Sequence, residues 1–219
     1  MGATAKVAPM LGIHHYWLFI ATAIVLVLTP GQDTFFILGR SLASGRGAGV
    51  AAALGITAGS IIHTFLAALG LSALLATSPY AFMAVKFAGA AYLLYIGARA
   101  LLSRGGNLPG AESGANGTHW SAFRQGIFSN LLNPKVALFF LALLPQFIDA
   151  GKAGQAAAFV ALGLLFDAGG TAVNIAVAAE LGLASARLAR AAAVRRGLER
   201  TAGALFVALG LRLALGARG

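Results

Sequence analysis

The sequence Thr29-Pro30-Gly31-Gln32-Asp33 interrupts the first hydrophobic stretch of the chain, and Asn133-Pro134-Lys135 interrupts a later one. The residues around the two prolines align as an internal repeat, in the pairs Leu28 and Leu132, Thr29 and Asn133, Phe35 and Phe139, Phe36 and Phe140, and Ile37 and Leu141. A proline in a membrane helix removes a backbone hydrogen bond, and the freed polar groups are tolerated only where they face protein or a wet cavity. The helix breaks at Pro30-Gly31 and at Pro134 therefore predict a substrate site near the membrane midplane, as in transporters built from inverted repeats.

Composition indicates a membrane protein. Hydrophobic residues make up 59% of the 219 positions and charged residues 10%, whereas about 25% of the residues in an average soluble domain are charged. A helix needs about 20 mostly apolar residues to cross a bilayer. The length therefore allows about six spans with short loops and leaves no room for a soluble domain, so we expect one all-α transmembrane domain over residues 1–219.

Hydrophobic runs divide the chain into two similar halves. The predicted runs are residues 11–28 continuing after the break as 33–42, then 49–76, 80–102, 120–148 with its break at Pro134, 155–179 and 201–215. A loop rich in Gly, Ser and Asn at 103–119 separates the halves, which extend over about 11–102 and 120–217. This pattern predicts six transmembrane helices in two inverted three-helix repeats, each of which opens with a broken helix.

The basic residues predict an orientation in the membrane. The net charge is +10, but the basic residues lie between apolar runs and form no stripe interleaved with aromatic residues, which argues against nucleic-acid binding. The loops on one side hold ten arginines, namely Arg40, Arg46, Arg99, Arg104, Arg124, Arg187, Arg190, Arg195, Arg196 and Arg200. The other side holds Lys6, Lys152, Arg212 and Arg218. Because Lys and Arg accumulate in cytoplasmic loops, we expect the basic loops in the cytoplasm and both termini outside it.

Catalytic and metal-binding patterns are absent from the sequence. Cysteine does not occur, and the four histidines do not have the spacing of metal ligands. Neither a His-Glu-x-x-His motif, nor a Gly-x-Ser-x-Gly elbow, nor a nucleotide-binding loop is found. We therefore expect neither an enzyme nor a protein with a metal or other cofactor.

An ordered set of motifs resembles the LysE/RhtB family of small bacterial amino-acid exporters. In chain order the motifs are Leu28 to Thr34, Gly39-Arg40, Gly45 to Gly49, Ser78-Pro79, Lys86 to Gly97, Asn130 to Lys135, Phe139-Phe140 and Leu144 to Phe147. The family's usual signature is Pro-Gly-Pro, and this chain has Gln32 in place of the second proline. The resemblance implies a multi-pass protein of the bacterial inner membrane that exports amino acids or related small metabolites, driven by the proton gradient.

Asp33 and Lys135 are the main candidates for substrate binding. A charge inside a membrane helix costs about 2.5 to 3.5 kcal/mol, so it is rare unless it is used. Asp33 begins a half-helix, where it either caps the helix or accepts a substrate ammonium group or a proton. Lys135 either extends to the membrane interface or binds the substrate carboxylate. Together the two charges would bracket a zwitterion. A pair between them without substrate would lower the cost of burying both, but the sequence leaves open whether they are in contact.

Further polar residues are candidates for the same site. Asp167 and Asn174 are seven residues apart and share one helix face. Asp167 is the second candidate for a proton relay, and a hydrogen bond between helices is the alternative role. Gln32, Asn130 and Asn133 offer neutral hydrogen bonds to substrate, although Asn before Pro is also an ordinary turn signal.

Two alternatives to amino-acid export stay open from the sequence. The first is a cation or metal exporter on the same scaffold, and the second is a membrane assembly protein without a transported solute. The Gly-x-x-x-Gly spacings at Gly45 and Gly49 and at Gly55 and Gly59 predict close helix packing within the bundle, with a homodimer interface as the alternative.

Overall fold

The computed structural model describes residues 11–77, 79–102, 118–149, 154–179 and 192–215. These residues are helical apart from short connections, and their β-structure is limited to one antiparallel bridge between Ile13 and Ile148. The helices are α2 (Tyr16–Leu28), α3 (Gln32–Thr77), α4 (Pro79–Leu102), α5 (His119–Leu131), α6 (Pro134–Leu138), a π-helix η1 (Phe139–Leu143), a 3-10 helix η2 (Leu144–Phe147), α7 (Gln155–Ala179) and α9 (Ala192–Leu215).

The first break separates α2 from α3. Helix α2 ends at Leu28, and Thr29 has an extended backbone with φ −73° and ψ 111°. A residue before a proline is disfavoured in the helical region, and Pro30 has no N–H to continue the helical ladder. Helix α3 begins at Gln32, so Asp33 lies in its first turn. The predicted break is therefore confirmed.

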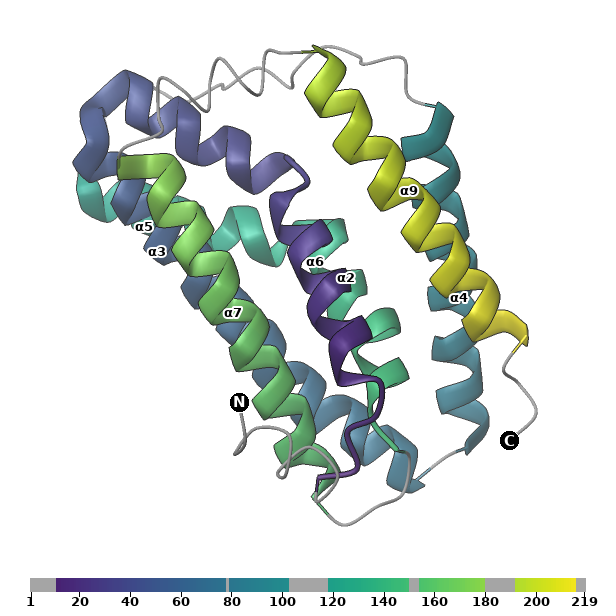
Figure 1. Ribbon diagram of the computed structural model, residues 1–219. Helices are drawn as coiled ribbons and strands as arrows, with labels where there is room; N and C mark the ends of the chain where they lie inside the picture. The colour runs from purple at the N-terminus through teal and green to yellow at the C-terminus, as the bar shows by residue number, and fades with distance from the viewer. Residues whose placement is uncertain (1–10, 78, 103–117, 150–153, 180–191, 216–219) are drawn as a thin grey trace.

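Helix α3 contains a reversal at Gly45. Its φ of 83° and ψ of 172° are not helical, and this positive φ is favourable for glycine because glycine has no Cβ. Residues 32–44 form a half-helix that leads away from the break, and residues 46–77 form a long helix that returns past it (Figure 1). The gap between the predicted runs 33–42 and 49–76 thus contains a helix reversal.

The second break separates α5 from the helices that follow. The Oδ1 atom of Asn133 accepts a hydrogen bond of 3.0 Å from the backbone N–H of Lys135 and so caps α6. Pro134 occupies the first helical position, where a missing N–H costs nothing. The segment from Pro134 to Phe147 is bent by 48° from α5. The sequence prediction of one broken helix here is confirmed.

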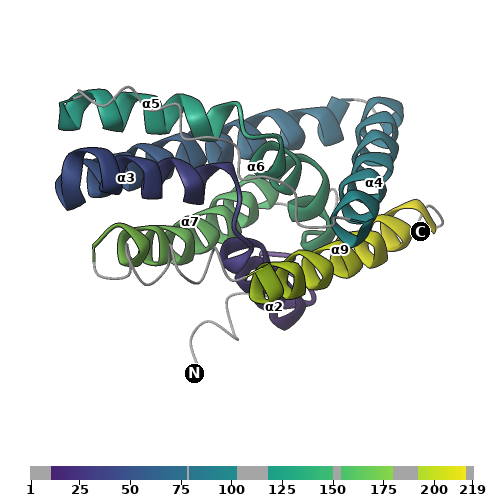
Figure 2. The same cartoon turned by 90° about the horizontal axis from the view of Figure 1, so that it is seen from above.

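The two broken helices run in opposite directions (Figure 1), and their breaks are in contact, because Nζ of Lys135 donates to the carbonyl of Thr29. In Figures 1 and 2, α2 leads to the first break and the half-helix of α3 continues beyond it, while α5 returns beside that half-helix and α6 to η2 run back alongside α2. Helix α7 flanks the bundle, and α4 packs with α9 at one side. Next to the Ile13–Ile148 bridge, the N–H of Asp149 donates to the carbonyl of Gly12 at 2.8 Å.

Small residues bring α3 and α5 into backbone contact. A Cβ added at Gly55 would collide with the carbonyl oxygen of Phe123, and one added at Gly59 would lie 2.9 Å from the Cβ of Asn130. The Gly55 and Gly59 pair therefore serves packing within the bundle, as predicted. Gly45 does not, because an added Cβ would meet nothing within 4 Å. Its role is the reversal of α3.

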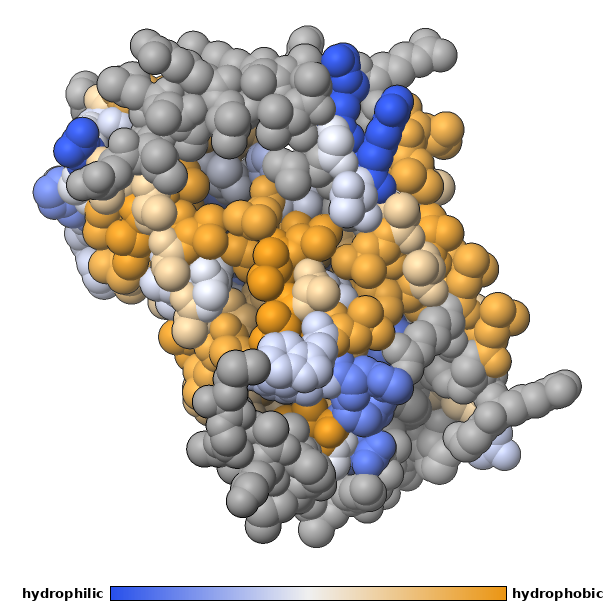
Figure 3. All heavy atoms as spheres, in the orientation of Figure 1, coloured by the Kyte–Doolittle hydropathy of each residue, from blue (hydrophilic) through white to orange (hydrophobic). Residues whose placement is uncertain are grey.

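The described helices include membrane-spanning candidates. Gln32–Leu71 and Gln155–Ala179 are long and apolar enough to cross a membrane, and the bent pair of His119–Leu131 with Pro134–Phe147 is a third candidate. Figure 3 shows apolar side chains over the middle of one face and hydrophilic ones toward its two ends. The chain is therefore an all-α membrane protein.

Two predicted boundaries differ from the structure or fall partly outside the described residues. Helix α9 begins at Ala192 rather than near Thr201, because the basic segment before the apolar run is rich in Ala, Arg, Leu and Glu, which favour helix without being apolar. The predicted loop at 103–119 falls outside the described residues as far as residue 117, and His119 already belongs to α5.

Candidate functional site

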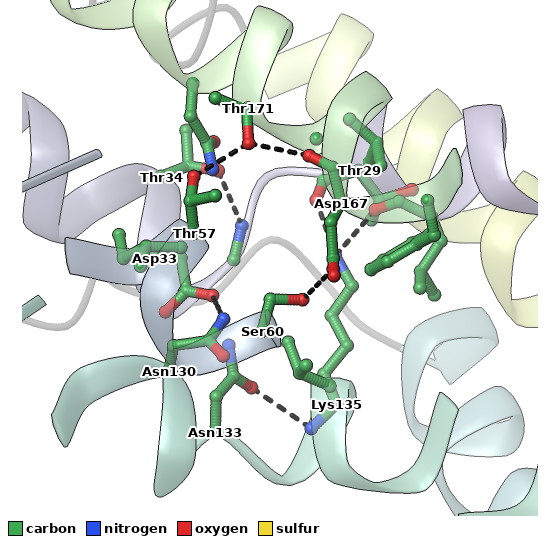
Figure 4. A pocket seen from close by; sticks show the side chains of 18 residues that line it. Thr29, Asp33, Thr34, Thr57, Ser60, Asn130, Asn133, Lys135, Asp167 and Thr171 are labelled. Carbon is green, nitrogen blue, oxygen red and sulfur yellow. Dashed lines mark hydrogen bonds between the residues drawn. The ribbon is translucent and has the colours of Figure 1, made fainter. Parts of the chain in front are cut away.

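The two breaks meet at one pocket enclosed by α2, α3, α5, α6 and α7. Its space, counted with its open mouth, is about 570 Å³. The polar residues that line it are Thr29, Asp33, Thr34, Thr57, Ser60, Asn130, Asn133, Lys135, Asp167, Thr171 and Asn174. The residues labelled in Figure 4 come from elements that are distant in sequence, and their side chains gather around one space. We call this space the central pocket.

The carboxylate of Asp33 is bound by the second broken helix. Its Oδ2 atom accepts a hydrogen bond of 2.9 Å from Nδ2 of Asn130, and its Oδ1 atom accepts one of 3.3 Å from Oγ of Ser129. Asn130 is buried, and its Oδ1 atom has no hydrogen-bond donor among the described residues. Asp33 therefore does more than cap its own helix, and an unused acceptor lies beside it.

The ammonium group of Lys135 is bound by the first broken helix. Its Nζ atom donates hydrogen bonds of 2.8 Å to the carbonyls of Leu26 and Thr29. These carbonyls lie at the C-terminal end of α2, where helical partners are missing and the partial charge is negative. An ammonium group has three donors, so one remains without an acceptor in the described part of the chain. Lys135 thus points to the first break rather than to a membrane interface.

Asp33 and Lys135 do not form an ion pair with each other. Both side chains are described, and the hydrogen bonds of each go to other partners. The contact that the sequence left open is therefore not made, because each charge has partners at the opposite break. Both residues nevertheless line the central pocket.

Asp167 lies between α7 and α3 with both carboxylate oxygens occupied. Ser60 donates to Oδ1 at 2.5 Å, and Thr64 donates to Oδ2 at 2.9 Å. Thr171 donates to the backbone carbonyl of Asp167 at 2.6 Å, and its hydroxyl lies 2.7 Å from that of Thr57. The sequence analysis missed these hydroxyl groups. Their spacing at positions 57, 60 and 64 of an apolar helix is the signal that was available.

The structure brings together six of the seven polar candidates. Asp33, Lys135, Asp167, Asn174, Asn130 and Asn133 all line the central pocket. Gln32 does not line it; its side chain is exposed and its Nε2 atom lies 3.4 Å from the carbonyl of Ser129. Among the described residues, no group of three or more His, Asp or Glu side chains is placed to hold a metal ion.

Comparison with known families decides the class of protein. The profile of the LysE type translocators matches residues 24–217, which include both breaks and the whole central pocket. The chain belongs to the LysE type translocator family. It is therefore a membrane transporter and not an enzyme. No solved structure matches the chain.

Individual relatives of this LysE type translocator cover different parts of it. An uncharacterized membrane protein of Pseudomonas aeruginosa is 32% identical over 214 residues, which is 94% of this chain and 97% of the relative. A leucine efflux protein of Salmonella typhimurium is 36% identical over 138 residues, 63% of this chain and 65% of the relative. A leucine efflux protein of an Enterobacter strain is 32% identical over 151 residues, covering 69% and 72%.

Proposed function

We propose that this LysE type translocator is a secondary active exporter that carries amino acids out across the bacterial inner membrane in exchange for protons. The observation that carries the proposal is the central pocket, which holds an acidic and a basic side chain that each bind other partners and not one another. A free amino acid is a zwitterion, so one end requires a carboxylate and the other an ammonium or comparable donor. Two separated opposite charges in one small space fit that requirement.

The proposed architecture has six spans in two inverted halves of three helices. The opposite directions of the two broken helices support this arrangement (Figure 1). So does the alignment of Thr29 with Asn133, whose backbone angles of −73° and 111° and of −77° and 107° are nearly the same. Inverted halves allow the site to open alternately to the two sides as one half rocks against the other.

The proposed orientation places the basic end of the molecule in the cytoplasm, with both termini outside. The reversal of α3, the end of α4, the start of α5 and the start of α9 lie toward one end in Figure 1, and these segments carry Arg46, Arg99, Arg124 and Arg196. An excess of Lys and Arg is typical of cytoplasmic loops. A cysteine introduced at Ser103, with accessibility to a membrane-impermeant thiol reagent in intact cells, tests the orientation.

Substrate binding at these residues would replace bonds within the protein. The substrate ammonium group would bind Asp33 and use the unpaired Oδ1 of Asn130, and the carboxylate would take the remaining donor of Lys135. Because Asp33 and Lys135 also hold the two broken helices together, competition for their bonds would loosen the contact between the halves. Binding and movement are thus linked through the same atoms.

Protons would be carried by Asp33 in the proposed cycle. Asp33 releases a proton to the cytoplasm, binds the substrate ammonium group, and is protonated again from outside when the substrate leaves. Asp167 is the second proton carrier, supported by its buried position at the wall of the same pocket. Asp167→Asn tests this role, because an asparagine can keep a hydrogen bond but cannot carry a proton. If the amide variant keeps wild-type proton coupling, Asp167 serves only to join α3 and α7.

The relatives favour an aliphatic amino acid as the substrate. The Salmonella and Enterobacter relatives are named leucine efflux proteins. Leucine is a zwitterion with an apolar side chain. We therefore place leucine first among the substrates to be tested. A homodimer stays a prediction that cross-linking in the membrane would check.

The deciding experiment is an efflux screen. Cells that express the protein are fed dipeptides, and the amino acids that appear outside are compared with cells that carry an empty vector and with cells that carry the Asp33→Asn variant. We expect faster release of one or a few neutral amino acids with the wild-type protein alone. Release of metal cations without amino acids would favour the cation exporter, and no difference for any solute would favour the assembly protein.

A further inference from the structure

Apolar residues form part of the wall of the central pocket. They are Leu26 and Val27 of α2, Ile56 of α3, Val136 of α6 and Phe166 of α7, and Gly170 of α7 lines the pocket with them. Asp167 lies close by, but both oxygens of its carboxylate already accept hydrogen bonds from Ser60 and Thr64. The carboxylate next to Phe166 is therefore already occupied, and the wall around Val27, Phe166 and Gly170 suits an aliphatic side chain.

Phe166 is a rigid part of this wall. Its ring is stacked on that of Phe139 with the centroids 4.0 Å apart, and it meets the ring of Phe140 edge to face at 5.9 Å. These contacts anchor Phe166 to the π-helix η1 of the second broken helix. A substrate side chain therefore cannot gain space by displacing Phe166 without disturbing that packing.

Gly170 lies one turn after Phe166 on the same face of α7 and leaves space beside it. A Cβ added at Gly170 would approach Cγ2 of Val27 at 3.8 Å and meet nothing closer. Gly163 on the same helix differs, because a Cβ there would lie 2.6 Å from Oγ1 of Thr64. Gly163 is thus required by helix packing, whereas the packing around Gly170 would accept a methyl group.

We propose that Gly170 sets the largest substrate side chain that the central pocket accepts, by keeping open the space between α2 and α7 next to Val27 and Phe166. This inference rests on the proposed amino-acid export. The side chain of a bound leucine would occupy the space next to Gly170. A residue larger than glycine at position 170 would take up that same space. Removing space for one methylene in an apolar pocket changes discrimination by about 10- to 200-fold.

Gly169 provides a matched control on the same helix. It is adjacent in sequence, but it faces an outer apolar groove between α2 and α7 and does not line the central pocket. A Cβ at Gly169 would meet nothing within 4 Å. Replacing either glycine with alanine or valine therefore has similar consequences for the helix, while only the change at Gly170 narrows the central pocket.

The test compares substrate profiles of Gly170→Ala, Gly170→Val, Gly169→Ala and Gly169→Val. Purified proteins are reconstituted into vesicles preloaded with leucine, valine or alanine, and the initial export rates are measured. We expect the leucine-to-alanine ratio to fall at least about tenfold for Gly170→Val and less for Gly170→Ala, with wild-type ratios for both Gly169 variants. Retained alanine export shows that a variant is folded.

Two other results have separate meanings. If the wild-type protein exports leucine and the Gly170 variants, whose folding is verified by size-exclusion chromatography and thermal unfolding, keep its leucine-to-alanine ratio, the role of Gly170 is wrong and the proposed function stands. A Gly170→Val variant that is folded but has lost leucine and alanine export equally also contradicts a role in size selection. If the wild-type protein exports no amino acid at all, the proposed function itself fails.

Discussion

At the first helix break an acid follows the proline, and at the second break a base does. The backbone at the two breaks is nearly the same, because Thr29 and Asn133 both precede a proline and adopt almost equal angles. Their side chains act differently. Thr29 donates back to the carbonyl of Val25 in the helix that ends, at 2.6 Å, whereas Asn133 caps the helix that begins.

Each break binds the charged side chain of the other. Lys135 of the second break binds the free carbonyls of the first, and Ser129 and Asn130 beside the second break bind Asp33 of the first. Asp33 lies at the start of α3, and the ammonium group of Lys135, which itself belongs to the start of α6, lies at the end of α2; the dipoles of α3 and α2 favour these two placements. Neither broken helix satisfies its polar groups alone, so the pair of breaks is the structural unit.

The largest effect is expected for Asp33→Asn. The variant keeps the shape of the side chain but can neither carry a proton nor attract an ammonium group, so substrate-driven proton movement should fall to the level of vesicles without protein. Everted vesicles with a pH-sensitive dye measure this. Unchanged coupling would remove Asp33 from the mechanism and leave it a purely structural partner of Asn130.

Lys135→Met should lower stability as well as remove the proposed contact with the substrate carboxylate. Two carbonyls at the end of α2 would lose their donor, and each unsatisfied buried polar group costs about 1 to 3 kcal/mol. Thermal unfolding in detergent should show a lower midpoint than for wild type, with a smaller decrease for Lys135→Arg, which keeps a cationic donor. A methionine variant with wild-type stability would mean that Lys135 does not hold the first break.

Asn133→Ala compares the cap at the second break with an ordinary cap. Thr118 is the matched control, because its side chain accepts a hydrogen bond from Ser121 at the start of α5, away from the break. Each alanine substitution should lower the free energy of unfolding by about 1 kcal/mol. Only Asn133→Ala should also slow transport, as measured by the efflux assay. Equal transport by both variants would show that the cap does not shape the site.

The smallest effect is expected for Gln32→Pro, which restores the proline of the family signature. Gln32 is the first residue of α3, where proline is well tolerated, and a compatible proline stabilises by about 0.4 to 1 kcal/mol. Phe35→Pro is the control, because its N–H donates to the carbonyl of Gly31 at 3.1 Å and its loss costs about 3 kcal/mol or more. A destabilised Gln32→Pro variant, measured by thermal unfolding, would show that the break requires the glutamine.

The helices and six of the pocket residues could be predicted from the sequence, but the hydrogen bonds of those residues could not. The two breaks and the position of α7 followed from prolines and apolar runs, which act locally. The start of α9 was missed because helix formation extends beyond the apolar part of a sequence. Ser60 and Thr64 were missed because hydroxyl residues are common in membrane helices, and their partner Asp167 lies 107 and 103 positions away.

By itself the sequence determined that this is an all-helical membrane protein, where its helices break, and which charges lie at the breaks, because proline geometry and apolar length act over a few residues. The tertiary structure alone decided that Lys135 binds α2 from 109 and 106 positions away and that Asp33 is bound by α5. It also decided that a Cβ at Gly170 would lie at ordinary contact distance from Val27, whereas one at Gly163 would collide with Thr64. Such choices depend on how the helices pack, because contacts between distant segments are set by the shapes and spacing of whole helix faces.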